Sequence, residues 1–430
     1  MAKKDVFKKT VFAVLGVCLA AILFFAGYFT YYLTMSREEK YLLWAAGMIA
    51  DKYTVYDETT GRYKEYTAEE LIKALVAGLP LDRYSAFYSE KEYADVVATS
   101  HGNQFGVGLT FSSASDEAVI FSVIGNSPAE RAGIVAGGRI TALEYGGEQR
   151  EINGYSAFAA ALSAVPANEP FDLYITYNGE PVRYELRRES FKESYVRYAD
   201  SGTGYVFRAE GANEPTGTQA EEKRIAELAE NTAYIAFSSF MYPAVGQFAD
   251  ALEFMFARGK SALVLDLRNN GGGYMDVLTE IASYFIPSGK RVNLVASAKP
   301  KRGAEEKFYT SADRYDARLK ELVILANDGT ASAAECLIGA LQYYGMADGG
   351  NIVITKNADG RARTFGKGIM QTTYVSNWGG ALKLTTAYVY QPDGETCIHG
   401  TGIGTAAENE IAPVAGKDAE LLRAIEILKG

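Results

Sequence analysis

Residues 261–286 read SALVLDLRNNGGGYMDVLTEIASYFI, and this stretch decides the fold of the C-terminal half. Its first part, SALVLDL (261–267), is a short apolar run of the kind that forms a buried strand. Two asparagines and three glycines (269–273) then predict a tight turn, and YMDVLTEIASYFI (274–286) predicts a helix. A buried strand, a turn and a helix in this order form the repeating unit of a parallel α/β sheet.

The same unit occurs before and after this stretch. YIAFSSF (234–240) predicts a strand and FADALEFMFARG (248–259) a helix. Downstream, ELVILAN (321–327) predicts a strand and ASAAECLIGALQYYG (331–345) a helix. This alternation favours a largely parallel sheet with helices on its faces, which we expect residues 191–430 to form.

The preceding part of the chain has a different pattern. Residues 105–190 contain short runs rich in β-branched and aromatic residues, namely GVGLTF, AVIFSVI, RITALEY, FDLYITYN and VRYELRRE. Short helices are predicted at 127–133 and 155–165, so this segment is expected to be a compact α+β module. Residues 37–104 are expected to be a mainly helical segment, in which AEELIKALVAGL (68–79) predicts an amphipathic helix. The polar stretch 200–232 predicts a loop. The predicted fold class is therefore multidomain, with α/β and α+β parts.

The N-terminus predicts a membrane anchor. Between Thr10 and Ser36 the chain carries no charged residue, and about 20 apolar residues suffice for a helix to span a bilayer. Lysines precede the run, so the positive-inside rule puts the N-terminus in the cytoplasm. We predict a single-pass anchor within residues 1–36, in the cell membrane, with the remainder extracytoplasmic. The alternative, a cleaved signal peptide, fits less well because the run is long and ends in bulky residues.

Composition excludes several classes of protein. The net charge of −10 argues against nucleic-acid binding, which needs clustered Lys and Arg. The three cysteines do not form a disulfide framework, and Cys397 with the nearby His399 is weak evidence for zinc. We therefore predict no metal and no cofactor.

Ser332 begins a predicted helix after a sharp turn, where a nucleophile would be held exposed. The turn at 269–273 and the turn before Ser332 both follow strands, and the carboxyl ends of parallel strands are where active sites collect. The N–H groups of these turns could stabilise an oxyanion. The alternative is that Ser332 is only a helix N-cap, since Glu335 stands three residues later as in a capping box.

A nucleophilic serine needs a base, and the chain has only two histidines, His101 and His399. His101 is far upstream and His399 lies in a glycine-flanked turn. A lysine serves as a base where burial lowers its pKa. Lys367, in TFGKGIMQ (364–371), is a candidate, although a surface lysine in a glycine turn is the simpler interpretation.

These segments, in this order, resemble the carboxyl-terminal processing proteases, a family of Ser/Lys peptidases that carry a PDZ domain. The segments with the resemblance are LDRYSAFYSEKEY (81–93), GVGLTF (106–111), SPAERAGIVAGGRITAL (127–143), LVLDLRNNGGG (263–273), NDGTASAAE (327–335), TFGKGIMQ (364–371) and IHGTGI (398–403). The resemblance implies a serine endopeptidase in which Ser332 is the nucleophile, Lys367 the general base and Gln371 the residue that positions Lys367. It also implies an oxyanion hole formed by the N–H groups of Gly273 (or Gly272) and Ala333.

The resemblance further implies that residues 105–190 are a PDZ domain. Its carboxylate-binding loop would be formed by Gly106, Val107, Gly108 and Leu109, and the substrate tail would add as a strand beside them. Phe105, Leu109 and Phe111 would favour an apolar last residue. The alternative is that the glycines of this loop mark a β-bulge. The expected partners are thus proteins or peptides with free, apolar C-termini.

The sequence departs from the family pattern in three places. The family commonly has an Asp after the Gln of the nucleophile helix, whereas here Tyr343 follows Gln342. Ser332 and Lys367 are separated by more residues than the family leads us to expect. We interpret GGNIVITKNADGRAR (349–363) as the extra residues, which form either a loop that leaves the dyad intact or one that displaces Lys367. In addition, GTAAENEI (404–411) lacks the family's usual pattern, which puts the C-terminal strand in question. The rival hypothesis is a catalytically inactive PDZ-bearing scaffold that binds C-termini without cutting.

Overall fold

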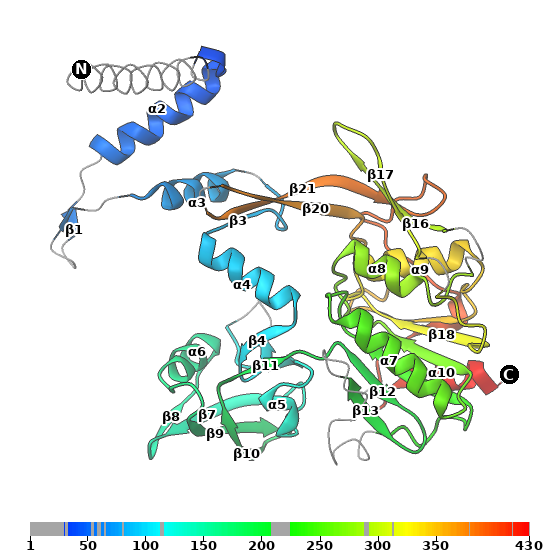
Figure 1. Ribbon diagram of the computed structural model, residues 1–430. Coiled ribbons are helices and arrows are strands. Elements are labelled where there is room, and N and C mark those ends of the chain that lie inside the picture. Colours follow the sequence, from blue (N-terminus) through cyan, green and yellow to red (C-terminus); the bar gives the residue numbers. More distant parts are fainter. Residues whose placement is uncertain are drawn as a thin grey trace, which may run out of the picture. The chain divides into compact units, whose positions relative to one another are not determined.

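The computed structural model describes residues 30, 33–52, 56–57, 62–63, 66–79, 81–111, 116–207, 224–287, 292–311, 314–377, 379–414 and 416–429. The chain divides into two units, residues 1–89 and 90–430 (Figure 1). Each unit is described by itself below.

The first unit contains short elements: α2 (Arg37–Lys52), β1 (Tyr56–Asp57), β2 (Arg62–Tyr63), α3 (Ala68–Gly78) and β3 (Ala86–Tyr88). The helix predicted at 68–79 is confirmed as α3, and a capping box of Thr67 and Glu70 begins it. Most of the predicted anchor lies outside the described residues. Among the helices that are described, none combines the length and the apolarity needed to cross a bilayer.

The second unit begins with an α+β module that has its own core. Its elements are α4 (Glu90–Ser100), β4 (Asn103–Gly106), β5 (Leu109–Phe111), β6 (Ile120–Val123), α5 (Pro128–Arg131), β7 (Arg139–Tyr145), β8 (Glu148–Glu151), α6 (Tyr155–Ser163), β9 (Pro170–Tyr177), β10 (Glu180–Arg187) and β11 (Glu189–Lys192). Strands pair antiparallel in the order β10-β9-β7-β8, while β5-β6 and β4-β11 form two ribbons. Ile140, Leu143, Phe158 and Leu173 are among its buried core residues. The short strands and two helices predicted for this segment are confirmed.

A larger sheet organises the rest of the unit. Its strands are β12 (Val196–Ala199), β13 (Gly204–Phe207), β14 (Thr232–Phe237), β15 (Ala262–Asp266), β18 (Glu321–Ala326), β19 (Ile352–Thr355) and β22 (Glu410–Ile411). They lie in the order β13-β12-β14-β15-β18-β19-β22. The pairs from β14 to β22 are parallel and those of β12 are antiparallel. The predicted largely parallel sheet is therefore confirmed.

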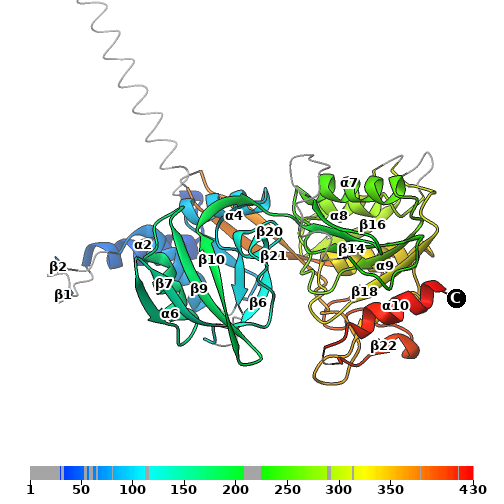
Figure 2. The ribbon, with the colours of Figure 1, turned by 90° about the horizontal axis from the view of Figure 1, so that it is seen from below.

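Helices cover both faces of this sheet. The helices α7 (Ala244–Ala257), α8 (Met275–Ala282) and α9 (Ala333–Tyr343) contribute to one hydrophobic core, and α10 (Ala419–Lys429) contributes to another. Figure 2 shows α7 and α8 on the side of the sheet opposite α10. Because β15 and β18 are covered on both faces, their residues are almost all buried, which explains their continuous apolar sequence.

A second, antiparallel sheet was not predicted from the sequence. It contains β16 (Leu294–Pro300), β17 (Glu306–Tyr309), β20 (Ile369–Val375) and β21 (Ala381–Tyr390), paired in the order β17-β16-β21-β20. Its strands alternate small, polar and aromatic residues, so they lack the apolar run that identified the parallel strands.

The interpretation of residues 349–363 as an added loop is wrong in part. Within it, β19 is a buried strand of the main sheet, paired with β18 through Ile324 and Ile352. Only residues 356–362 form a short hairpin, closed by an isolated bridge between Lys356 and Ala362. The questioned C-terminal strand is present as β22, and it pairs with β19.

A buried carboxylate ties α7 to β12. Asp200 is fully buried and accepts hydrogen bonds from Arg258 Nε at 2.6 Å, Gly202 N at 2.7 Å and the Tyr198 hydroxyl at 2.9 Å. Burial opposes its ionisation, but these hydrogen bonds prevail and lower the pKa of Asp200 to about 2. Because the folded pKa lies below the unfolded value of about 3.9, Asp200 stabilises the fold above that value and loses this contribution as the pH falls toward 2.

We therefore expect Asp200→Asn to lower stability at neutral pH and to reduce the loss of stability between about pH 4 and pH 2. Urea denaturation midpoints at a series of pH values measure both effects. Asp359→Asn, which changes an exposed carboxylate, is the matched control. A variant at Asp200 whose pH dependence equals that of the wild type would contradict the assignment.

Candidate active site

Two turns meet at the carboxyl ends of β15 and β18. The Asn269 N–H donates to Asn327 Oδ1 at 2.9 Å, and Asn327 Nδ2 donates back to Asn269 Oδ1 at 2.9 Å. The Ala331 N–H donates to the carbonyl of Asn270 at 2.8 Å. The glycine turn and the turn before Ser332 are therefore held together, as the strand order predicts.

Ser332 has an unusual backbone conformation, with φ of 58° and ψ of −119°. Among the described residues, the others with positive φ are glycines and four asparagines, and asparagine tolerates the left-handed region better than serine does. Ser332 is the N-cap of α9 and forms the expected capping box with Glu335. An ordinary N-cap residue has extended backbone angles, so capping alone does not account for the positive φ of Ser332. A strained residue at a strand–turn–helix junction is typical of a nucleophile held exposed.

Glu335 joins the two segments that carry the predicted dyad. This carboxylate is fully buried. Its Oε2 accepts the backbone N–H of Ser332 at 2.9 Å and that of Lys367 at 2.9 Å. Its Oε1 accepts the Gly366 N–H at 2.7 Å and the Thr364 hydroxyl at 2.5 Å. Because the nitrogens of Ser332 and Lys367 both bond one oxygen, they lie no farther apart than twice 2.9 Å.

The 364–371 segment is a loop followed by a strand. Lys367 is half-buried and precedes β20, and Gln371 lies within β20 after a bulge. Gln371 Nε2 donates to Thr385 Oγ1 on β21 at 2.9 Å. The Phe365 N–H donates to the carbonyl of Thr330 at 2.9 Å, which adds a second link to the Ser332 turn.

Cys336 follows Glu335 on α9 and is buried. Burial raises the pKa of its thiol to about 12, although the nearby Lys367 charge opposes the shift. The thiol therefore remains protonated at neutral pH and is a poor nucleophile.

The glycine turn approaches Ser332 closely. A Cβ atom on Gly272 would lie 2.7 Å from Ser332 Cβ and 2.8 Å from Ala333 N, so only glycine fits there. The Gly272 N–H already donates to Asn270 Oδ1 at 2.9 Å. Ala333 is the first residue of α9, and such N–H groups have no intrahelical partner. Within the described residues, neither the Ala333 N–H nor the Gly273 N–H donates to a protein acceptor.

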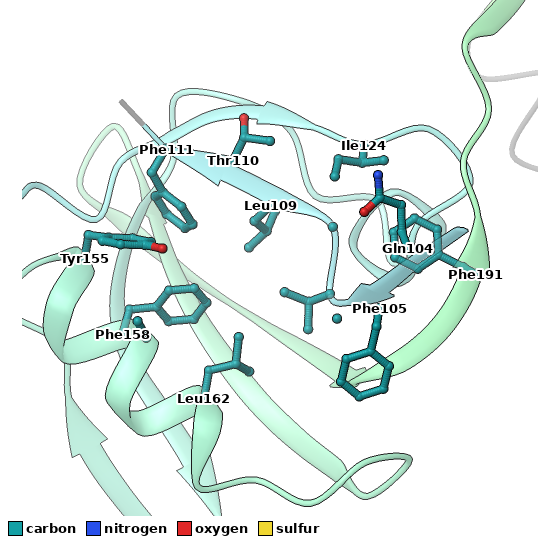
Figure 3. A pocket seen from close by; sticks show the side chains of 14 residues that line it. Gln104, Phe105, Leu109, Thr110, Phe111, Ile124, Tyr155, Phe158, Leu162 and Phe191 are labelled. Carbon is teal, nitrogen blue, oxygen red and sulfur yellow. The ribbon is translucent and has the colours of Figure 1, made fainter. Parts of the chain in front are cut away.

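The predicted carboxylate-binding loop lines a groove of about 580 Å³. Figure 3 shows Leu109 and Phe111 of β5 opposite Phe158 and Leu162 of α6 across this groove. The residues predicted to bind a tail all line it, namely Phe105, Gly106, Val107, Gly108 and Leu109. One edge of β5 pairs with β6, and its other edge has no partner strand among the described residues.

Residues with important contacts at the site were not identified as such from the sequence. Glu335 was considered only as part of a capping box, and Thr364 and Asn270 were not considered. Asn270 Nδ2 donates to the carbonyl of Phe237 at 2.7 Å and so fixes the glycine turn to the end of β14. The capping-box spacing from Ser332 to Glu335 is the only local sequence signal for this glutamate.

Comparisons with known proteins show what this chain is similar to. A model of peptidase family S41 matches residues 231–407, which contain the two turns, Glu335 and the 364–371 segment. The probable CtpA-like serine protease of Staphylococcus aureus (strain bovine RF122 / ET3-1) is 29% identical over 352 residues, which are 79% of this chain and 60% of the relative. The carboxy-terminal processing protease CtpA of Bacillus subtilis (strain 168) is 27% identical over 366 residues, which are 84% of this chain and 68% of the relative.

Among solved structures, the photosystem II D1 C-terminal processing protease aligns over 88% of this chain and 89% of its own, at 21% identity and a TM-score of 0.49. The matched part of the chain spans about 60% of the length of the Staphylococcus aureus relative named above. Residues 231–407, which contain the Ser332 turn, Glu335 and Lys367, thus match peptidase family S41, and the CtpA-like serine proteases are similar to most of this chain.

Proposed function

We propose that this chain is a membrane-anchored serine endopeptidase that binds substrate C-termini in a PDZ domain and cuts with Ser332, Lys367 and Gln371. The observation that carries the proposal is the Glu335 carboxylate, which holds the backbones of Ser332 and Lys367 on the same oxygen. A dyad requires those two residues to be neighbours, although they stand far apart in the sequence.

The reaction is acyl transfer. Ser332 Oγ attacks the carbonyl carbon of the scissile bond while Lys367, as a neutral amine, takes the hydroxyl proton. The negative charge that develops on the carbonyl oxygen is stabilised by the N–H groups of Gly273 and Ala333. Lys367 returns the proton to the leaving amine, and water then hydrolyses the ester formed on Ser332. Gln371 orients Lys367 from β20.

The groove between β5 and α6 supports the role in tail recognition. Val107 and Gly108 lie between β4 and β5, and within the described residues their N–H groups donate to no protein acceptor. They suit a terminal carboxylate, and the unpaired edge of β5 suits an extended tail. The side chains lining the groove are mostly apolar, so the last residue of the tail is expected to be apolar as well.

The anchor rests on the sequence. The uncharged run from Thr10 to Ser36 spans the membrane once, the lysines before it keep the N-terminus in the cytoplasm, and the proteolytic domain acts outside. Protease protection in intact cells tests this orientation: an epitope after Gly430 should be digested from outside.

Active-site labelling tests the proposed chemistry. A fluorophosphonate probe should form a covalent adduct on Ser332, located by mass spectrometry. The labelled protein should no longer cleave an unfolded protein with an apolar C-terminus. If the adduct is absent and the unlabelled protein does not cleave, the chain is the inactive, tail-binding scaffold instead.

We expect Gly108→Ala to weaken tail binding by at least about tenfold. Gly108 has φ of 80°, and a Cβ atom there would lie 2.1 Å from Ser127 Cβ, so the loop must move and its N–H groups lose their alignment. Fluorescence anisotropy with a labelled peptide that ends in a free apolar residue measures the effect. Gly133→Ala is the matched control, because Gly133 has φ of 81° but open space around it. Equal losses in both variants would refute the role of the loop.

A further inference from the structure

The strand β20 forms an open edge of the antiparallel sheet. In the order β17-β16-β21-β20, β20 is the last strand, and among the described strands it pairs only with β21. In an antiparallel strand the N–H and C=O groups of alternate residues point to opposite edges. Within residues 90–430 as described, the backbone N–H and C=O groups of β20 that point away from β21 therefore have no partner strand. Its last residues are exposed, and Val375 is 60% exposed.

This edge lacks the usual protection against pairing. Exposed edges are normally blocked by charged residues, proline or short length. The sequence of β20 is IMQTTYV, with seven residues, no charge and no proline. The opposite edge of the same sheet, β17, carries Glu306 and Lys307. Among the described strands, β20 is the longest edge strand without a charge or a proline.

The position of β20 relates the open edge to the proposed catalytic residues. The strand begins at Ile369, two residues after Lys367. The Lys367 backbone is fixed by Glu335, and the Gly368 carbonyl accepts the N–H of Val389 on β21 at 2.9 Å. The start of β20 is thus held beside the site, and the strand extends about 23 Å from there, at roughly 3.3 Å per residue.

We propose that the outer edge of β20 binds the substrate chain near the scissile bond as an added β-strand. The inference rests on the proposed function, and it adds a second peptide-binding edge, distinct from the groove of β5. Main-chain hydrogen bonds to an uncharged strand do not depend on the substrate's side chains. The edge therefore admits any unfolded segment, while selectivity for the tail lies in the β5 groove.

Two adjacent proline substitutions test the proposal. Of Thr373→Pro and Tyr374→Pro, one removes an N–H that bonds β21 and should lower Tm, and the other removes an outward N–H and should leave Tm unchanged. The variant with unchanged Tm should bind an unfolded, C-terminally amidated peptide roughly tenfold more weakly, since it loses a main-chain hydrogen bond and gains a steric clash. The amide prevents binding through the β5 groove.

The binding is measured by anisotropy in full-length protein that also carries Ser332→Ala, so that cleavage does not interfere and the result is independent of catalysis. Lys307→Pro and Phe308→Pro on β17 are the matched controls. If the variant with unchanged Tm binds the peptide as the wild type does, or if the mass in solution changes instead, β20 is not a substrate-binding edge. A change of the mass in solution would mean that the edge pairs with another copy of the chain.

A second measurement does not depend on whether the variants fold. The peptides for this measurement are each N-methylated at one backbone amide, and they are tested against protein without substitutions in β20. Affinity should fall when the methyl group stands at every second residue of the peptide and should be kept at the residues between. Uniform tolerance of N-methylation would overturn strand addition. Absence of cleavage by the wild-type protein, with the periodic loss still present, would refute the proposed endopeptidase and leave β20 as a peptide-binding edge.

Discussion

Lys367→Met is expected to lower kcat for peptide hydrolysis by a factor of about 10² to 10⁴, the usual contribution of a general base. Methionine has a similar length and fits a half-buried site, but it cannot accept the Ser332 proton. The variant should keep the hydrogen bond that fixes this segment to Glu335, because the donor is the backbone N–H of residue 367, which methionine retains. Substrate affinity, measured as Kd in the absence of turnover, should change little.

The pH dependence distinguishes a base from a structural lysine. If Lys367 is the base, kcat/KM of the wild type rises with pH as the amine loses its proton, and this ascending limb disappears in Lys367→Met. Lys356→Met is the matched control, since Lys356 is partly exposed and pairs with Glu410 at 3.3 Å. Retention of both the rate and the ascending limb by Lys367→Met would rule out the dyad, and the Ser332→Ala variant gives the background rate.

The parallel part of the fold could be predicted from the sequence, and the physical reason is burial. The strands β15 and β18 are covered by helices on both faces, so they are apolar throughout and end at asparagine- and glycine-rich turns. The strand β19 is equally buried but has only four residues. It stands between Gly349-Gly350 and the polar stretch 356–363, and therefore resembled an insertion. Only its pairing with β18 identifies it as part of the sheet.

The site could be predicted only in its local parts. Ser332 and the glycine turn were found because they follow strands whose carboxyl ends must meet. The positive φ of Ser332 cannot be predicted from the residue types around it. The partners of Glu335 are equally hidden, because Thr364, Gly366 and Lys367 lie about thirty residues later in the chain and approach it only after folding. A capping box was the one local pattern that included this glutamate.

Glu335→Gln is expected to lower both stability and activity, for a reason that follows from the number of its donors. The carboxylate accepts four hydrogen bonds, two on each oxygen. In glutamine one oxygen becomes an NH₂ group that cannot accept, so two buried donors lose their partner, at a cost of about 1–3 kcal/mol each. The chain relaxes by moving the 364–371 loop away from α9. Since a shift of about 1 Å can cost 10²-fold in rate, kcat should fall by about that factor.

A control pair at Thr364 separates positioning from simple helix capping. The Thr364 hydroxyl donates to Glu335 Oε1 at 2.5 Å and accepts the Ile403 N–H at 2.7 Å. Thr364→Ser keeps both hydrogen bonds and should retain kcat, whereas Thr364→Val loses both and should reproduce the kcat defect of Glu335→Gln without touching α9. If Glu335 merely caps the helix, Glu335→Gln lowers Tm, but the fraction that remains folded keeps the wild-type kcat, and Thr364→Val is fully active. Active-site titration with the fluorophosphonate gives the folded fraction, so kcat per labelled site decides between the two roles.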